Sequence, residues 1–166
     1  MTQAFRHWLK ALIVAGAVAL SAQLSASARE LVALRGYEAG TVVIVTHQRA
    51  LYYVLGQGQA IRYPVGVGRA GMAWHGQAWI AQKRLRPAWQ APPELGGGAV
   101  IPGGSPRNPM GAAVLGLNRG NYAIHGTNDP TSIGGFVSHG CIRMHNEDVM
   151  DLYDRVSLGS NVYVLH

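Results

Sequence analysis

The sequence predicts a mainly β domain with one helix near its C-terminal end. β-Branched and aromatic residues gather in short runs, such as Thr41–Thr46 and Leu51–Leu55, and a turn-sized gap separates these runs. One segment after His145 instead repeats its apolar residues at helical spacing. The chain shows no internal repeat of about 20 to 50 residues and no linker between two globular pieces. These observations indicate a single domain built from hairpins and one helix.

Residues 1–28 have the organisation of a secretory signal peptide. Arg6 and Lys10 precede an apolar run, Ala11–Ala22, which is shorter than the roughly 20 residues that span a bilayer. Ala26-Ser27-Ala28 fits an A-x-A cleavage site. We therefore expect cleavage there, localisation in the periplasm or cell envelope with the membrane only as an export route, and a mature catalytic domain over residues 29–166. A retained membrane anchor is the alternative.

Further strands follow the first hairpin in chain order. Gly56-Gln57-Gly58 supplies a second turn, which leads into a strand over Ala60–Gly66. Ala78–Gln82 is the next strand candidate, and Ala112–Leu117 leads into a strand that ends at His125. Asn161–Leu165 is expected to close the domain as a last strand.

Two segments rich in proline or glycine are expected to be loops. Lys83–Leu95 contains three prolines and has no sustained period, and Gly96–Gly111 contains nine Gly or Pro in sixteen positions. A long loop inside a small domain is usually either functional or disordered. We expect part of Gly96–Gly111 to border the functional site; the alternative is an excursion without substrate contact.

The helix is predicted to begin at Asn146, a suitable N-cap residue. Glu147 and Asp148 favour the positive end of the helix dipole, and Gly159 is placed to end the helix. One face of it carries Val149, Met150, Leu152, Tyr153 and Val156. This apolar face is expected to pack behind the loop that holds the only cysteine.

The net charge of the chain excludes few classes of binding partner. Without the two basic residues of the leader, 12 Lys and Arg stand against 8 Asp and Glu, and they form no basic block. This balance suits an anionic polymer such as cell wall, and no interleaved aromatic and basic stripe argues for nucleic acid.

Cys141 is the only cysteine, so an exported chain of this sequence cannot form an intramolecular disulfide. It lies between Gly140 and Ile142 in a glycine-broken segment, with His139 before it and Arg143 after it. Basic neighbours of this kind favour the thiolate, which is the nucleophilic form. We interpret Cys141 as a nucleophile; an inert buried thiol is the alternative.

Two histidines are available to accept the proton of this thiol. His125 stands at the end of a predicted strand, where a side chain is held rigidly. His139 lies two positions before Cys141, on the same face if the segment is extended. Gly140 allows a tight turn whose backbone amides would point at a developing oxyanion. His139 is either a catalytic or a structural histidine.

The motifs around this cysteine resemble those of a known family. The run HGTNDPTSIGG from His125, then SHGCIRM from Ser138, then Asn146 with Asp148, resembles the signature of the L,D-transpeptidase (YkuD-type) catalytic domain of cell-wall enzymes. The opening hairpins resemble the same domain. The resemblance implies a β-sandwich or barrel-like fold, acyl transfer on peptidoglycan stem peptides, and no metal or organic cofactor. The acceptor would be a second stem or a wall-anchored protein.

The resemblance also implies roles for individual residues. Cys141 becomes acylated, His125 accepts and returns the proton, and the carbonyl of Gly126 orients that histidine. The backbone amides around His139, Gly140 and Cys141 form the oxyanion hole. Substrate contacts are assigned to Arg143, Ser138 and Gly126, with bracing of the loop as the other role open to Arg143.

One departure from the family pattern precedes the strand at Ala78. The family commonly has a Thr-Pro-x-Gly turn where this chain has Ala73-Trp74-His75-Gly76. Gly76 keeps the turn glycine, but the proline is missing. Trp74 is expected either to form a wall of the substrate groove or to lie on a half-buried face of the β domain.

Three other functions remain open at this stage. Water in place of the acceptor amine would make the same site an L,D-carboxypeptidase. The side chains of His125, His139, Cys141 and His145 are the types that bind zinc or copper, although their spacing matches no familiar motif. A catalytically silent peptidoglycan-binding domain is the third alternative, but it would not need a thiol.

Overall fold

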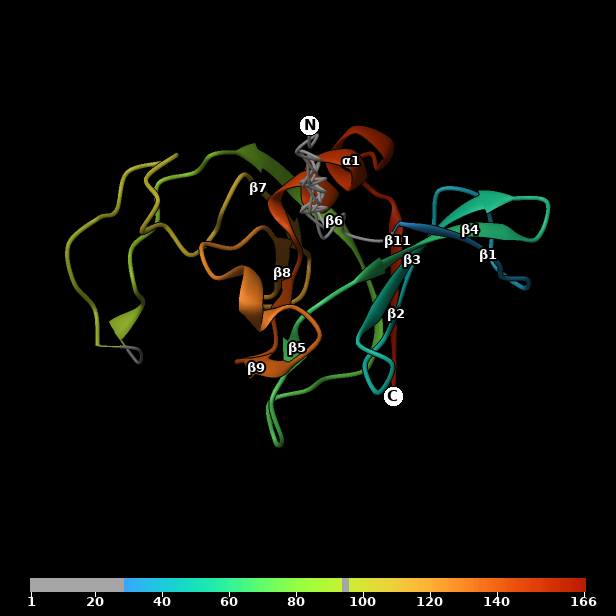
Figure 1. Ribbon diagram of the computed structural model, residues 1–166, viewed down its shortest axis with the longest axis horizontal. Helices are drawn as coiled ribbons and strands as arrows, with labels where there is room; N and C mark the ends of the chain where they lie inside the picture. The colour runs from blue at the N-terminus through green and yellow to red at the C-terminus, as the bar shows by residue number, and fades with distance from the viewer. Residues whose placement is uncertain (1–28, 94–95) are drawn as a thin grey trace, which may run out of the picture.

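The computed structural model describes residues 29–93 and 96–166, and it confirms the mainly β prediction (Figure 1). Nine strands form one sheet in the order β1-β4-β3-β2-β11-β6-β7-β8-β10, and β5 pairs with β9 in a second sheet. The strands are β1 (Glu30–Ala33), β2 (Val42–Val45), β3 (Ala50–Gly56), β4 (Gln59–Pro64), β5 (Val67–Gly68), β6 (Gly76–Leu85), β7 (Ala113–Leu117), β8 (Ala123–His125), β9 (Phe136–Ser138), β10 (Ile142–Arg143) and β11 (Asn161–Leu165). Among the described residues there is one α-helix, α1 (Asn146–Arg155). Pro130–Ser132 forms the short 3-10 helix η2.

The predicted signal peptide, residues 1–28, lies outside the described residues. In the part of the chain that is described, no helix is both long enough and apolar enough to cross a membrane.

Strands β2, β3 and β4 form the two consecutive hairpins that the sequence predicts. Their inward side chains, including Ile44, Leu51 and Tyr63, are fully buried in the core. The turn between β3 and β4 consists of Gln57 and Gly58, which both have positive φ angles, 53° and 75°. Such a two-residue turn matches the right-handed twist of the flanking strands, so it fixes their register.

Strand β6 joins the two parts of the large sheet. Its first residues, Gly76–Trp79, pair with β11, and its later residues, from Ile80 onward, pair with β7. The register shifts between Ile80 and Gln82. A strand that changes partners at an irregularity turns a corner of the sheet, as in sandwich-like packings. The apolar core fills the space between the two parts and the helix.

Helix α1 packs against β7 and β8 (Figure 1). Val149 and Leu152 are fully buried, and burial of each such side chain contributes about 1.5 to 3 kcal/mol. The C-terminal end of the helix is closed by Lys83 of β6, whose Nζ donates to the carbonyls of Tyr153 (2.7 Å) and Val156 (2.6 Å). These carbonyls would otherwise lack partners at a helix end. The helix therefore stands behind the strands that carry the predicted active site.

The predicted helix ends need correction. The N-cap is His145, which makes no capping hydrogen bond with its side chain, and Asn146 is the first helical residue. The side chain of Asn146 instead bonds to two loops, as described below. At the other end the helix stops at Arg155, since Val156 is already extended, and Gly159 lies in the turn that leads to β11.

The expected loop from Lys83 is also wrong for its first three residues. Lys83–Leu85 continue β6, because they pair with Ala113–Leu115 of β7. Strand β1 and the short strands β5, β9 and β10 were not predicted. Gly96–Gly111 has neither helix nor strand, as predicted, apart from an isolated bridge between Ile101 and Trp89.

Candidate active site

The site is built on the parallel strands β8 and β10. Ile142 lies opposite Ile124, and Arg143 lies opposite His125. Both isoleucines are buried on the core face, so the residues on either side of them point to the other face of the sheet. Cys141 directly precedes the first residue of β10, so by the same alternation we expect its side chain on the face of His125. From strand spacing and rise, the Cα atoms of such diagonal neighbours lie about 8 Å apart, within reach of a side chain as long as histidine.

His125 is buried and its ring is oriented by the backbone. Nδ1 donates to the carbonyl of Gly126 over 2.6 Å, so Nε2 is the nitrogen that carries the lone pair. The pKa of His125 is lowered to about 4, mainly by burial and to a smaller extent by the positive charge of Arg143. The carbonyls of Gly126 and Pro109 act in the opposite direction and raise it. At neutral pH the imidazole is therefore uncharged and able to accept a proton.

Cys141 is half-buried, and it is a free thiol. Burial raises the pKa of this thiol, while the N–H of Ala123 and the charge of Arg143 act in the opposite direction. The thiol donates weakly to the carbonyl of Asn121, with Sγ 3.7 Å from the oxygen. The resting pair is thus a neutral thiol and a neutral imidazole. The arrangement suits proton transfer at the moment of attack rather than a stable thiolate.

Arg143 is half-buried beside His125, and its charge lowers the pKa of both His125 and Cys141. Its backbone is fixed by a two-way bridge to Gly66, with N–H to O distances of 2.9 and 2.8 Å. None of the described carboxylates forms an ion pair with its guanidinium. A guanidinium in this state is suited to bind a carboxylate of a ligand.

The segment from Ser138 to Cys141, which we term the cysteine loop, is closed by the Ser138 hydroxyl. Ser138 Oγ donates to the carbonyl of Cys141 (2.6 Å) and accepts from the N–H of Gly140 (3.0 Å). The N–H of Gly140, one of the amides assigned to the oxyanion hole, is therefore engaged within the loop. Gly140 has a φ of 116°, and a Cβ there would lie 2.4 Å from Cε1 of Tyr122. Any other residue would displace the loop.

Trp74 packs against the cysteine loop. It is buried, its Nε1 donates to the carbonyl of Gly140 over 3.0 Å, and its ring stacks on Tyr122 with centroids 5.1 Å apart. Trp74 is buried, so the expected placement on a half-buried face is wrong, and the other expectation, a wall of the substrate groove, stays a prediction. The turn sequence alone did not indicate this contact with Gly140.

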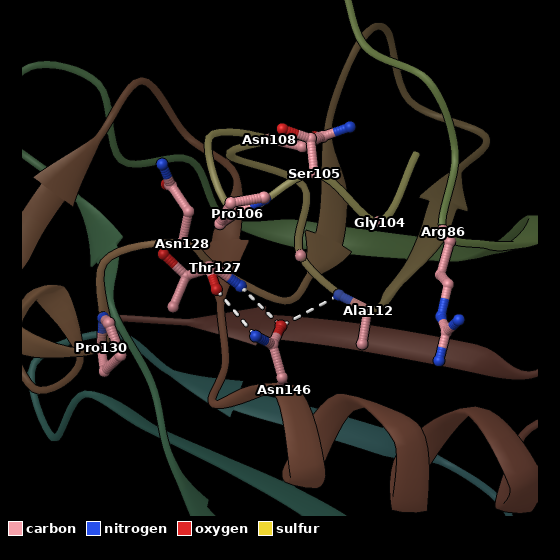
Figure 2. Close-up of a pocket in the computed structure, with 11 residues that line it drawn as sticks. Arg86, Gly104, Ser105, Pro106, Asn108, Ala112, Thr127, Asn128, Pro130 and Asn146 are labelled. Atoms are coloured by element: carbon pink, nitrogen blue, oxygen red, sulfur yellow. Dashed lines mark hydrogen bonds between the residues drawn. The ribbon is translucent and has the colours of Figure 1, made fainter. Parts of the chain in front are cut away.

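The side chain of Asn146 joins two loops, one at Ala112 and one at Thr127 (Figure 2). Its Oδ1 accepts from the N–H of Ala112 (2.9 Å) and of Thr127 (3.1 Å), and its Nδ2 donates to the carbonyl of Thr127 (2.9 Å). A Cβ on Gly126 would lie 2.2 Å from Oδ1 of Asn146. The side chain thus holds the residue next to the carbonyl that orients His125. The sequence pointed to Asn146 as a helix cap and as part of the family signature, but it did not predict these contacts.

A cavity of about 510 Å³ lies beside this junction. Its lining includes Arg86, Asn108, Thr127, Asn128 and Asn146, whereas Cys141, His125 and Arg143 do not line it (Figure 2). The Gly96–Gly111 loop contributes to one wall, and the carbonyl of Pro109 in the same loop acts on the pKa of His125. The loop therefore reaches the histidine.

The remaining histidines do not gather around Cys141 as metal ligands. His139 is exposed, and its Nε2 accepts from Nη2 of Arg69 at 2.7 Å. His145 is the half-buried N-cap of α1. Within residues 29–93 and 96–166, no three His, Cys, Asp or Glu side chains lie together as a metal site would require. The geometry gives the metal alternative no support.

Comparison with known proteins adds a family to this geometry. The model of the L,D-transpeptidase catalytic domain (YkuD) family matches residues 39–164. The probable L,D-transpeptidase YbiS of Escherichia coli is 35% identical over 136 residues, which cover 74% of this chain and 43% of that protein. The chain thus spans less than half the length of this relative.

Solved structures of low identity share the fold. L,D-transpeptidase 3 from Mycobacterium tuberculosis, in complex with a faropenem-derived adduct, has a TM-score of 0.61 and 18% identity, over 77% of this chain and 60% of that one. The Enterococcus faecium L,D-transpeptidase has a TM-score of 0.63 and 15% identity, over 77% and 50%. The sandwich-like catalytic-domain architecture is therefore common to all three.

Proposed function

Because this chain belongs to the YkuD family of L,D-transpeptidase catalytic domains, we propose that it transfers peptidoglycan stem peptides through a thioester on Cys141. The observation that carries the proposal is the register of β8 and β10. From this register we infer that the only thiol and the buried, backbone-oriented imidazole share one face of the sheet. The required elements of nucleophilic catalysis, a nucleophile with a base oriented by a third group, are all present in the chain.

In the first half-reaction the thiol of Cys141 attacks the carbonyl of the third stem residue. Nε2 of His125 accepts the thiol proton, since Nδ1 is occupied by Gly126. The tetrahedral intermediate then collapses, the bond to the terminal D-alanine breaks, and His125 returns the proton to the leaving amine. The products are a thioester on Cys141 and free D-alanine. The thiol of Cys141 and the imidazole of His125 are both uncharged before the reaction, so no thiolate–imidazolium ion pair has to be maintained in a buried site.

In the second half-reaction the amine of an acceptor attacks the thioester. His125 takes the proton of that amine and gives it to the departing sulfur, which restores the thiol. One base that reverses its role serves both halves, as microscopic reversibility requires. The acceptor is a second stem peptide or a wall-anchored protein. Water in the same position would give L,D-carboxypeptidase activity.

The charge of Arg143 is assigned to substrate recognition. Stem peptides carry carboxylates, and a guanidinium binds a carboxylate with two parallel hydrogen bonds. Arg143 lies next to His125 and has no acidic partner among the described side chains. The remaining part of the proposal is export: residues 1–28 act as a cleaved signal peptide, and the enzyme works in the periplasm or cell envelope.

The test is an assay with defined disaccharide tetrapeptides and product analysis by mass spectrometry. We expect release of D-alanine together with a dimer joined through third-position residues. Free tripeptide with no dimer would instead assign hydrolysis. No product, from a protein whose Cys141 is shown to be reduced and alkylatable, would refute the acyl-transfer chemistry. N-terminal sequencing of the exported protein tests cleavage before Arg29.

A further inference from the structure

The backbone on both sides of Cys141 is held by side chains. The carbonyl of Gly140 accepts from Nε1 of Trp74 at 3.0 Å, and the carbonyl of Cys141 accepts from Ser138 Oγ at 2.6 Å. The N–H of Gly140 donates to the same hydroxyl at 3.0 Å. Among the described residues, none accepts a hydrogen bond from the N–H of Cys141. This amide, like that of His139, is therefore available to a ligand.

The direction of that amide follows from the contact with Trp74. In a trans peptide unit the carbonyl and the N–H point in opposite directions within one plane. The chain has no cis peptide bond among the described residues. An indole that fixes the carbonyl of Gly140 thus turns the N–H of Cys141 away from itself. If this peptide unit rotated, the partly negative carbonyl oxygen of Gly140 would face the developing oxyanion instead of the N–H of Cys141.

The indole is itself held in place. Its ring is stacked on Tyr122 with an interplanar angle of 9°, and the guanidinium of Arg119 lies 5.1 Å from its centroid. Trp74 belongs to the short turn between β5 and β6. That turn folds back so closely that a Cβ on Gly68 would lie 2.9 Å from the carbonyl oxygen of Met72. A buried, stacked indole has little freedom to release its acceptor.

We propose that Trp74 is a positioning residue for acyl transfer, which acts by aiming the backbone N–H of Cys141 at the oxyanion of the tetrahedral intermediate. The inference rests on the acyl-transfer chemistry proposed above. Trp74 stands in the turn whose sequence departs from the common family pattern. Substrate does not need to touch Trp74 for it to act, since Gly140 transmits the effect.

The experiment compares two reactions of the same sulfur. Faropenem acylates a cysteine through a tetrahedral oxyanion, whereas iodoacetamide alkylates it by direct displacement without one. Trp74→Phe keeps a ring that stacks on Tyr122 but removes the N–H. We expect faropenem acylation, followed by intact mass, to slow by about 10- to 100-fold, below the effect of deleting an oxyanion donor outright. The rate of iodoacetamide labelling should stay within about twofold of wild type, and the pH midpoint of labelling should not move, because the thiol environment is retained.

The matched control is Trp79→Phe, the same substitution at a side chain that is 51% exposed on β6. It should change neither reaction. If Trp74→Phe slows both reactions equally, the indole only supports the fold of the loop and the inference is wrong; an unchanged acylation rate refutes it as well. If Trp74→Phe does not fold, Tyr122→Leu, which leaves the N–H but removes the stacking surface, must slow acylation selectively.

The same data separate this inference from the function on which it rests. Wild-type protein that iodoacetamide labels but faropenem does not acylate would overturn both. Wild-type protein that is acylated, with Trp74→Phe acylated equally fast, would overturn the role of Trp74 alone.

Discussion

Two regions of the molecule are held together in different ways. The hairpin half, which we define as β1–β4 with β11, consists of strands of four to seven residues that pair with one another around buried apolar side chains. The site half, which we define as β5, β8, β9, β10 and the cysteine loop, has strands of only two or three residues. Its backbone is fixed by side chains of Ser138, Trp74 and Asn146. Substitutions in the hairpin half should therefore affect stability, and substitutions in the site half should affect reactivity.

The largest effect is expected from the nucleophile. Cys141→Ser should reduce acylation by faropenem by roughly 10⁴-fold or more, because the alcohol is far less acidic than the thiol and His125 is a weak base. The unfolding midpoint should remain close to that of wild type, since the side chain is half-buried and nearly the same size. Intact mass and thermal melting measure the two quantities. A serine variant that forms the adduct at the wild-type rate would contradict the proposed function.

The opposite outcome is expected in the hairpin half. Leu51→Ala removes a fully buried side chain of β3 and should lower the free energy of unfolding by about 2 to 5 kcal/mol. Acylation per folded molecule should stay within about twofold of wild type. Urea titration gives the stability, and Leu55→Ala on the same strand, 41% exposed, is the control that should lose much less. A large loss of acylation by fully folded Leu51→Ala protein would show that the two halves are coupled.

Asn146→Ala tests the site half away from the cysteine. It removes three hydrogen bonds to the backbones of Ala112 and Thr127, next to the carbonyl that orients His125. We expect acylation to fall by about 10-fold or more, and stability to fall by about 1 to 3 kcal/mol from the unpaired backbone groups. Asn128→Ala, which removes one exposed hydrogen bond to Arg107, is the matched control. Equal acylation rates for both variants would show that Asn146 does not position the histidine.

The difference between the hairpin half and the site half also explains which features could be predicted from the sequence. In the hairpin half, alternation and turn glycines are local signals, and they located β2, β3 and β4 with errors of one or two residues. Strands as short as β5 or β10 contain too few residues for a period, so their pairing depends on partners far along the chain. The motif around Cys141 singled out His125 and Arg143, which lie opposite each other on β8 and β10. The contacts of Trp74 and Asn146 join backbone groups about 20 to 70 residues away, and no local pattern reports such contacts.

The pH dependence offers a smaller effect within the site half. The pKa of His125 is about 4, so the imidazole loses its ability to accept a proton only as the pH falls through that value. Faropenem acylation should therefore remain nearly constant from about pH 6.5 down to pH 5, where an ordinary histidine of pKa about 6.5 would already be protonated. Alkylation by iodoacetamide should rise with a midpoint at higher pH than that of an ordinary thiol, because burial raises the pKa of Cys141. An acid limb near pH 6.5 would mean that His125 is not buried as described.

The smallest effect is expected at His139, although it lies only two residues from the nucleophile. Its side chain is exposed and contacts Arg69, while the backbone of its loop is fixed by Ser138 and Trp74. His139→Gln keeps a polar side chain that can accept from Arg69, so acylation should change by less than about threefold. His125→Gln, measured beside it, should lose acylation by at least about 100-fold, because the base is removed. If the two variants lose activity to the same extent, the imidazole of His139 is a second proton-transfer group. Bound substrate would then have to cover this side chain, which is exposed in the free protein.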